Sequence, residues 1–236
     1  MINIKKTEKN FPELEVEKNK PNGTYRLPSV VDQLDKDFFG KCYLCEYKVV
    51  DANIEHITPH KSDDTLKFDW KNLFLACSHC NEIKSSTFNN IMNCTKEDVE
   101  AVLEYEVDHL PKVAIKVKTT VETASATQTV ALLNKIYNAS KPPLSKLDAY
   151  YRRELFQKQF GNFINALFKY SDIVDQENKS ITISSTEKQT IENEVKKFLL
   201  PTEIFSGILR YYISRQSDVM FNIFKQYIQT IKHSPS

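Results

Sequence analysis

The stretch from Cys42 to Lys84 reads CYLCEYKVVDANIEHITPHKSDDTLKFDWKNLFLACSHCNEIK. It holds two Cys-x-x-Cys pairs, Cys42 with Cys45 and Cys77 with Cys80. Each pair can place two thiolates on one metal ion, and four thiolates leave a tetrahedral Zn²⁺ without an open position. We therefore expect a structural zinc site at these four cysteines. The two pairs are further apart than in a compact zinc ribbon, so additional structure must lie between them.

The segment around and between the cysteine pairs also carries residues suited to catalysis. A histidine can accept a proton near neutral pH. Carboxylate and amide oxygens suit hard divalent cations. The candidates follow one another in the order Glu55, His56, Asn72, Asn81 and Lys84.

The order of these residues resembles the HNH endonuclease motif of the ββα-metal (His-Me finger) superfamily. The matching pieces are Glu-His-Ile-x-Pro from Glu55 and Asn-Leu-x-x-x-Cys-x-x-Cys-Asn-x-x-Lys from Asn72. Each piece is weak alone, but their combination in the correct order is specific. The resemblance implies two short strands and a helix around the catalytic residues. With the helical pattern further along, we expect an α+β fold: a zinc-stapled ββα-metal HNH core and a mainly α-helical C-terminal domain.

The resemblance also implies a role for each candidate. His56 would be the general base that activates water. Glu55 and Asn81 would bind a catalytic Mg²⁺ or Mn²⁺. Asn72 would pin a loop and orient the base, and Lys84 is a candidate phosphate contact. Two positions depart from the common pattern, since many relatives have Asp at the position of Glu55 and His at that of Asn81.

Plainer interpretations of the same residues stay open. His56 could be a zinc ligand or a surface histidine, and Asn72 a turn residue. Lys84 could be a solvated helix lysine. We expect His79, inside the second cysteine pair, to be exposed, and His60 to lie in a loop.

Composition narrows the class of protein. The chain has 236 residues, of which 41% are hydrophobic and 27% charged, as in an ordinary globular protein. It has no apolar run long enough for a membrane span, and its start lacks the apolar core of a signal peptide. We therefore expect a cytoplasmic protein without a membrane partner. A fifth cysteine, Cys94, fits a reducing compartment as a free thiol.

The predicted nuclease segment is not basic. Between Gly40 and Asn90 there are six lysines and seven acidic residues. Affinity for nucleic acid usually depends on neutralising phosphates with lysine and arginine. Another surface, or a partner, would have to supply the positive charge.

We divide the chain into three parts. Residues 1–27 are expected to form an extended N-terminal arm that could dock on the body through Ile2, Ile4 and Val16. Its Lys5, Lys6 and Lys9 could contact nucleic acid, although we favour a solvated tail for them. Residues 28–140 would form the HNH nuclease domain, and residues 141–236 a helical partner-binding domain after Pro142-Pro143. The expected helices are 29–39, 78–84, 95–103, 125–137, 144–172, 184–200, 203–215 and 218–232, with strands at 54–57 and 72–76 and a hairpin over 104–118.

Three details of these elements are specific enough to check. Ser29 is a candidate N-cap, and Ser184 with Glu187 a candidate capping box. The long helix should bury one side that includes Leu147, Tyr151, Leu155, Phe163, Leu167 and Tyr170. Gly161 is a candidate bend within it.

A looser resemblance concerns residues 126–138, ATQTVALLNKIYN. This run resembles the segment after the HNH motif in the PtuB-type nucleases of Septu anti-phage systems, some of which are associated with retrons. It implies a defence effector that works with a PtuA-like ABC/AAA ATPase, and in some systems with a retron reverse transcriptase–msDNA complex. The substrate would be DNA or tRNA. The alternative is a non-catalytic zinc adaptor, which would need the four cysteines but neither Glu55 nor His56.

Overall fold

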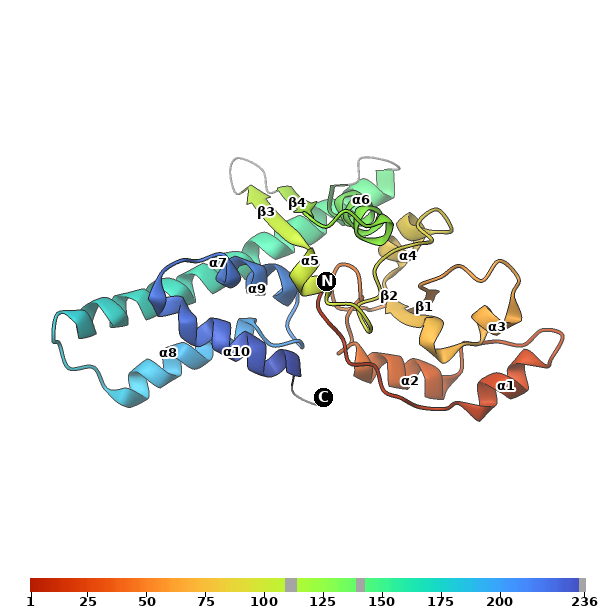
Figure 1. The fold of residues 1–236 in the computed structure, drawn as a ribbon, viewed down its shortest axis with the longest axis horizontal. Helices are drawn as coiled ribbons and strands as arrows, with labels where there is room; N and C mark the ends of the chain where they lie inside the picture. Colours follow the sequence, from red (N-terminus) through yellow and green to blue (C-terminus); the bar gives the residue numbers. More distant parts are fainter. Residues whose placement is uncertain (109–113, 139–142, 234–236) are drawn as a thin grey trace.

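The computed structural model describes residues 1–108, 114–138 and 143–233. It confirms the α+β class, with two small antiparallel hairpins and a largely helical C-terminal part (Figure 1). In chain order the elements are α1 (Pro12–Lys18), α2 (Pro28–Asp37), β1 (Asn53–His56), α3 (Asp64–Lys67), η1 (Trp70–Asn72), β2 (Leu73–Ala76), α4 (Ser78–Lys84), α5 (Val99–Val102), β3 (Glu104–Asp108), β4 (Ala114–Lys118), α6 (Ala124–Asn138), α7 (Pro143–Asn178), α8 (Ser185–Phe198), α9 (Ser206–Ser214), η2 (Val219–Phe221) and α10 (Asn222–His233).

The core of the N-terminal half is the β1–β2 hairpin with α4 beside it. The strands pair antiparallel, with Glu55 opposite Phe74 and His56 opposite Leu73. All four residues of β2 are buried, which explains why this strand reads as a continuous apolar run. Asn72 belongs to the 3₁₀ turn before β2 rather than to the strand. Asp69 starts that turn by accepting a hydrogen bond from the Lys71 amide.

Helix α2 leads into the first cysteine pair. Its buried face carries Val30 and Leu34, with Phe38 just after its end, and Gly40 follows at φ +65°, a conformation that glycine adopts without strain. The expected N-cap is wrong: Leu27 occupies that position with Pro28 at the first helical turn. The Ser29 hydroxyl instead donates to Glu13.

The start of the chain packs against the body instead of extending into solvent. Met1, Ile2 and Ile4 are buried, and the Ile4 amide donates to the Cys94 carbonyl at 2.8 Å. Val16, in contrast, is 57% exposed on α1, so the expected contact at that residue is wrong. The expected docking is confirmed at Ile2 and Ile4, whose apolar side chains are removed from water.

Lys6 enters the same region as a buried cation. Its amine donates to the carbonyls of Trp70 and Leu73 and lies 3.9 Å from the centre of the Trp70 ring. Burial disfavours the charged amine and lowers the pKa of Lys6 to about 7, against the attraction of Asp37 and Asp69. The N-terminal segment is therefore anchored beside the turn that precedes β2.

The C-terminal part is helical, as expected, with α7 as its longest element. α7 passes Gly161 without a break in the helix, although a bend was expected there. Phe163 and Tyr170 face the core, but Leu147 and Tyr151 are 49% and 60% exposed, so the expected apolar side is wrong near its start. Ser184 occupies the N-cap of α8 without a side-chain capping bond.

Two expectations fall outside the described residues. The proposed boundary between residues 140 and 141 is one, and part of the hairpin turn near Asp108 to Pro111 is the other. The strands that flank that turn do pair, with Tyr105 opposite Val117.

Among the described helices, none combines the length and the apolar character needed to cross a bilayer.

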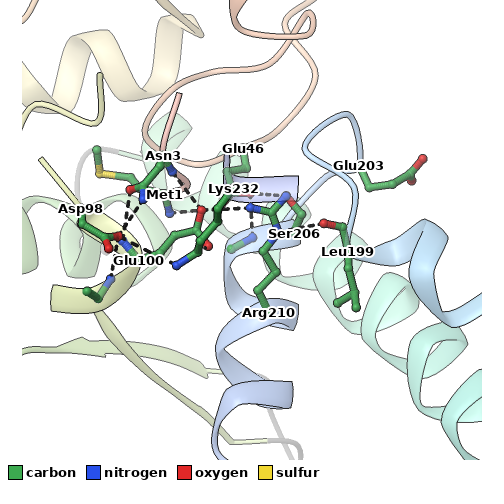
Figure 2. Close-up of polar contacts among 12 residues, drawn as sticks. Met1, Asn3, Glu46, Asp98, Glu100, Leu199, Glu203, Ser206, Arg210 and Lys232 are labelled. Carbon is green, nitrogen blue, oxygen red and sulfur yellow. Dashed lines mark hydrogen bonds and ion pairs between the residues drawn. The ribbon is translucent and has the colours of Figure 1, made fainter. Parts of the chain in front are cut away.

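A buried polar junction around Glu46 and Glu100 joins the start of the chain to α9 and α10 (Figure 2). Arg210 on α9 forms an ion pair with Glu100 at 2.9 Å and donates through Nε to the Leu199 carbonyl at 2.7 Å. Lys232 on α10 reaches the same Glu100 at 3.3 Å. The Asn3 amide also donates to Glu100. The C-terminal helices are thus held to the N-terminal half by buried charge pairs as well as by apolar packing.

Candidate functional site

The four cysteines meet at one point, as their spacing predicts. Their Sγ atoms all lie within 4.8 Å of one another, and all four residues are buried. The Sγ atoms of Cys45 and Cys77 are 3.9 Å apart. A tetrahedral Zn²⁺ with Zn–S bonds of about 2.3 Å requires sulfur atoms about 3.8 Å apart. The four cysteines are therefore positioned to bind a structural zinc ion.

The local backbone conformation positions the two cysteines of each pair. In the first, the Glu46 amide donates to the Cys42 carbonyl and the Cys42 amide donates to the Tyr47 carbonyl, both at 2.9 Å. Glu46 adopts φ +57°, an unusual conformation for a residue with a side chain, which closes this turn. In the second, Cys77 is the N-cap of α4 and Cys80 lies in its first turn.

Arg152 is a partner of the zinc site that the sequence analysis missed. Its Nη2 donates to the Cys77 Sγ at 3.1 Å, and its guanidinium lies 5.5 Å from the centre of the Tyr47 ring. Four thiolates around Zn²⁺ carry a net charge of about −2, and a buried cation compensates part of it. Arg152 stands on α7, far along the chain, and nothing in its local sequence marks it as a neighbour of the cysteines.

His79 is buried rather than exposed, so that expectation is wrong. Its Nε2 lies 3.0 Å from the Ile136 carbonyl, and because a carbonyl only accepts, Nε2 carries the proton. Its Nδ1 lies 3.6 Å from the Asp148 carboxylate. These contacts connect α4 with α6 and α7, so His79 serves the packing of the zinc-bearing helix.

His56 is buried at the end of β1 with one nitrogen engaged. Nε2 lies 2.9 Å from the Lys67 carbonyl, so Nε2 is the donor and the neutral ring leaves Nδ1 as an acceptor. Burial lowers the pKa of His56, which favours this neutral form. Its ring meets those of Tyr25 and His60, with centroids 4.6 Å and 4.7 Å away. An imidazole in this state can accept a proton.

Asn72 closes the loop between β1 and β2. Its Oδ1 accepts from the Thr58 amide, and its Nδ2 donates to the carbonyls of Thr58 and Leu66, each at 2.9 Å. The side chain is buried and uses both its acceptor and its donors on the backbone. Asn72 therefore fixes the chain directly after His56.

Glu55 lies on the other face of β1, between the first cysteine pair and α4. Its Oε1 is 2.6 Å from the Lys84 amine, and its Oε2 accepts from the Tyr43 hydroxyl at 2.8 Å. The Lys84 amine also donates to the His56 carbonyl at 2.9 Å. Burial raises the pKa of Glu55, although Lys84 and Tyr43 both favour the ionised carboxylate.

Two expectations change at this position. Lys84 is fully buried, so the interpretation as a solvated helix lysine is wrong. The HNH resemblance also implies a bend in β1 that brings Glu55 and His56 to one face, but their side chains contact different elements, as the alternation of a regular strand requires. Tyr43 was missed because it lies within the cysteine pair, where the zinc ligands dominate the pattern.

Glu55 and Asn81 are the residues that could hold a hard divalent ion. Within the described ranges, the four cysteines form the only cluster of three or more His, Cys, Asp or Glu residues that could hold a metal. An ion at Glu55 would thus have one carboxylate, and Asn81, one helical turn before Lys84 and partly exposed, could add its amide oxygen. One carboxylate, an amide oxygen and water suit Mg²⁺, which keeps several of its waters in protein sites.

Comparison with known families agrees with this geometry. Residues 42–87 match the family model of the HNH endonuclease. No curated protein and no solved structure matches the chain. The matched segment covers both cysteine pairs, the β1–β2 hairpin and α4, so residues 42–87 form an HNH domain with a four-cysteine zinc-binding group.

Proposed function

We propose that the chain is a metal-dependent endonuclease that hydrolyses phosphodiester bonds in nucleic acid, with His56 as the general base. The observation that carries the proposal is the state of His56 within the HNH segment. Its Nε2 is committed to the Lys67 carbonyl, its pKa is lowered, and Nδ1 is left to accept a proton. An adaptor that only binds would not need a histidine held in this way.

The HNH resemblance implies a course for the reaction. His56 takes a proton from water through Nδ1 while the water oxygen attacks phosphorus, and the bond to the 3′-oxygen breaks. Asn72 keeps the loop after His56 in place through its three backbone hydrogen bonds. Glu55 and Asn81 would hold Mg²⁺ or Mn²⁺, which would stabilise the charge on the phosphate and on the leaving oxygen. The HNH resemblance implies products with a 5′-phosphate and a 3′-hydroxyl.

We further propose a role in anti-phage defence alongside a PtuA-like ATPase, with DNA or tRNA as substrate. The support is the likeness of residues 126–138 to Septu nucleases and the lack of basic character around the HNH domain, which favours delivery of the substrate by a partner. Exposed apolar residues at the start of α7 suit a docking surface: Leu147, Tyr150 and Tyr151 are about half exposed beside a groove of about 610 Å³. A retron reverse transcriptase–msDNA complex could join the same assembly.

The test compares the native chain with His56→Ala and His60→Ala on labelled tRNA and plasmid DNA in Mg²⁺. Each protein is assayed with and without a PtuA-like ATPase. His56→Ala should lower the cleavage rate by about 10²- to 10⁴-fold, the usual contribution of a general base. His60→Ala removes a neighbouring imidazole and should keep most of the activity.

Equal cleavage by the native chain and His56→Ala would refute the assignment of the base. If no protein cuts either substrate even with the ATPase, while all of them bind nucleic acid, the zinc adaptor becomes the better account. The substrate that is cut identifies the target class.

A further inference from the structure

Glu55 is held by two groups of different character. On one side the Lys84 ammonium touches Oε1 at 2.6 Å, and on the other the Tyr43 hydroxyl donates to Oε2 at 2.8 Å. Lys84 is fully buried, so in this arrangement it cannot also touch a nucleic acid. Its positive charge is directed at the carboxylate and at the His56 carbonyl.

The two partners differ in how firmly they are fixed. The Tyr43 ring packs between aromatic neighbours, with centroids 6.5 Å from Phe38 and 5.0 Å from Phe74, and its backbone lies within the zinc-binding pair. Lys84 ends a flexible four-carbon side chain in the last turn of α4. Tyr43 is therefore the fixed anchor of the carboxylate, and the lysine amine is the partner that can move.

We propose that Lys84 is a resident cation that competes with the catalytic divalent ion for Oε1 of Glu55. This inference rests on the proposed function, in which Glu55 binds that ion. An ammonium and a dication attracted to the same carboxylate oxygen repel each other strongly, because they would lie only a few ångströms apart in a largely buried site. Binding of the ion therefore displaces the Lys84 amine, while Tyr43 keeps Oε2 in place.

The position of Lys84 also indicates where the displaced amine can go. Asn81 and Lys84 are three residues apart on α4, so their side chains are neighbours on the surface of that helix. An amine released from Glu55 stays close to the ion and to the phosphate that the ion binds. Lys84 would then act as a positioning residue that keeps the carboxylate ordered before the ion arrives, and it would reach the phosphate only afterwards.

The test measures Mn²⁺ binding to the zinc-loaded full chain by the electron paramagnetic resonance signal of free Mn²⁺. Lys84→Gln removes the charge but keeps a donor for Glu55 and for the His56 carbonyl. It should bind Mn²⁺ about tenfold or more tightly than the native chain, because the competing charge is gone. Lys71→Gln, which removes an exposed lysine of the same domain, should leave the affinity unchanged.

Glu55→Gln distinguishes the competition by Lys84 from the underlying assignment of Glu55 as an ion ligand. If Glu55→Gln weakens Mn²⁺ binding but Lys84→Gln does not tighten it, competition is refuted and the metal site stands. If neither variant changes the affinity, the assignment of Glu55 as an ion ligand fails, and the inference fails with it.

A folding defect in Lys84→Gln would also be informative. The melting temperature would then be measured over a series of Mn²⁺ concentrations. Competition predicts that Mn²⁺ raises the melting temperature of Lys84→Gln more than that of the native chain, since the ion replaces the missing charge. An equal or smaller rise would overturn the proposal.

Discussion

Glu46 and Glu55 are buried carboxylates in the same domain with opposite electrostatic settings. Around Glu46 there are two cations and two further donors: the Met1 ammonium at 2.9 Å, the Gly207 amide at 3.0 Å, the Ser206 hydroxyl at 3.1 Å and the Lys41 amine at 3.9 Å. Burial alone would raise the pKa of Glu46, but these groups outweigh it and lower the value to about 2.

Glu55 has one ammonium and one hydroxyl, and its pKa is raised because burial outweighs them. The comparison teaches that the number of cations and donors decides what a buried carboxylate can do. Glu46 is saturated and belongs to the junction that holds the C-terminal helices (Figure 2). Glu55 still has lone pairs and too little compensating charge, which suits a residue that receives a divalent ion.

The largest effect should come from breaking the zinc site, on which both carboxylates depend. Tyr43 lies within the first cysteine pair, and Glu46 directly follows it. Cys77→Ser removes one thiolate and the acceptor of Arg152, so we expect loss of zinc and unfolding of the HNH domain. Structural zinc contributes about 10 kcal/mol in small zinc domains, which is comparable to the whole stability of a domain.

The measurement is zinc content together with thermal melting followed by circular dichroism. Cys94→Ser is the matched control, because Cys94 is also buried but lies outside the four-cysteine group. Cys94→Ser should keep its zinc and lose little stability. A Cys77→Ser protein with normal zinc content and melting would show that the four cysteines are not the structural staple.

A smaller loss of stability should distinguish the structural role of Glu46 from the ion-binding role of Glu55. Glu46→Gln removes the charge opposite the Met1 ammonium and Lys41 and leaves both cations buried without a carboxylate. We expect a loss of about 3–5 kcal/mol in the free energy of unfolding, the usual cost of breaking a buried ion pair. Urea denaturation measures it, with Glu122→Gln as an exposed control that should change stability by about 0.5 kcal/mol or less.

Divalent ions should not rescue this variant. The cations around Glu46 leave no reason for Mn²⁺ to bind there, whereas Mn²⁺ should stabilise variants at Lys84. A loss below about 1 kcal/mol in Glu46→Gln, or its recovery in Mn²⁺, would contradict the division between a structural and an ion-binding carboxylate.

Sequence reasoning succeeded where the information was local. The spacing of the cysteines predicted the zinc site, and the HNH resemblance of the segment between them implied β1, β2 and α4 close to their observed positions. These features depend on residues near one another in the chain. The HNH match over residues 42–87 agrees with the same local pattern.

Contacts between distant segments could not be predicted in this way. The bond from Arg152 to Cys77, and the packing of Gly207 on Glu46, join elements whose meeting no local pattern encodes. The same limit explains the errors at Leu147, whose periodic spacing suggested burial, and at Val16, which was expected to dock: both side chains are exposed. Periodicity identifies a potential apolar face, but the partner that buries it is set by the tertiary fold.

The smallest predicted change in stability concerns the tight packing of Gly207 against Glu46 and Met1. A Cβ on Gly207 would lie 2.5 Å from the Glu46 Oε1 and 2.7 Å from the Met1 carbonyl oxygen. Gly207→Ala should therefore push α9 away from the first cysteine pair and cost about 1–3 kcal/mol, the range for overpacking a tight interior.

Gly161 provides the matched control, because it too lies within a helix but a Cβ there would meet nothing within 4 Å. Gly161→Ala should stabilise the protein by about 0.5–1 kcal/mol, since alanine loses less backbone entropy in a helix than glycine does. Urea denaturation of the two variants should thus give changes of opposite sign. Equal changes would mean that α9 can shift without cost, and the junction would then owe its stability to the charge pairs rather than to the close fit of Gly207 on Glu46.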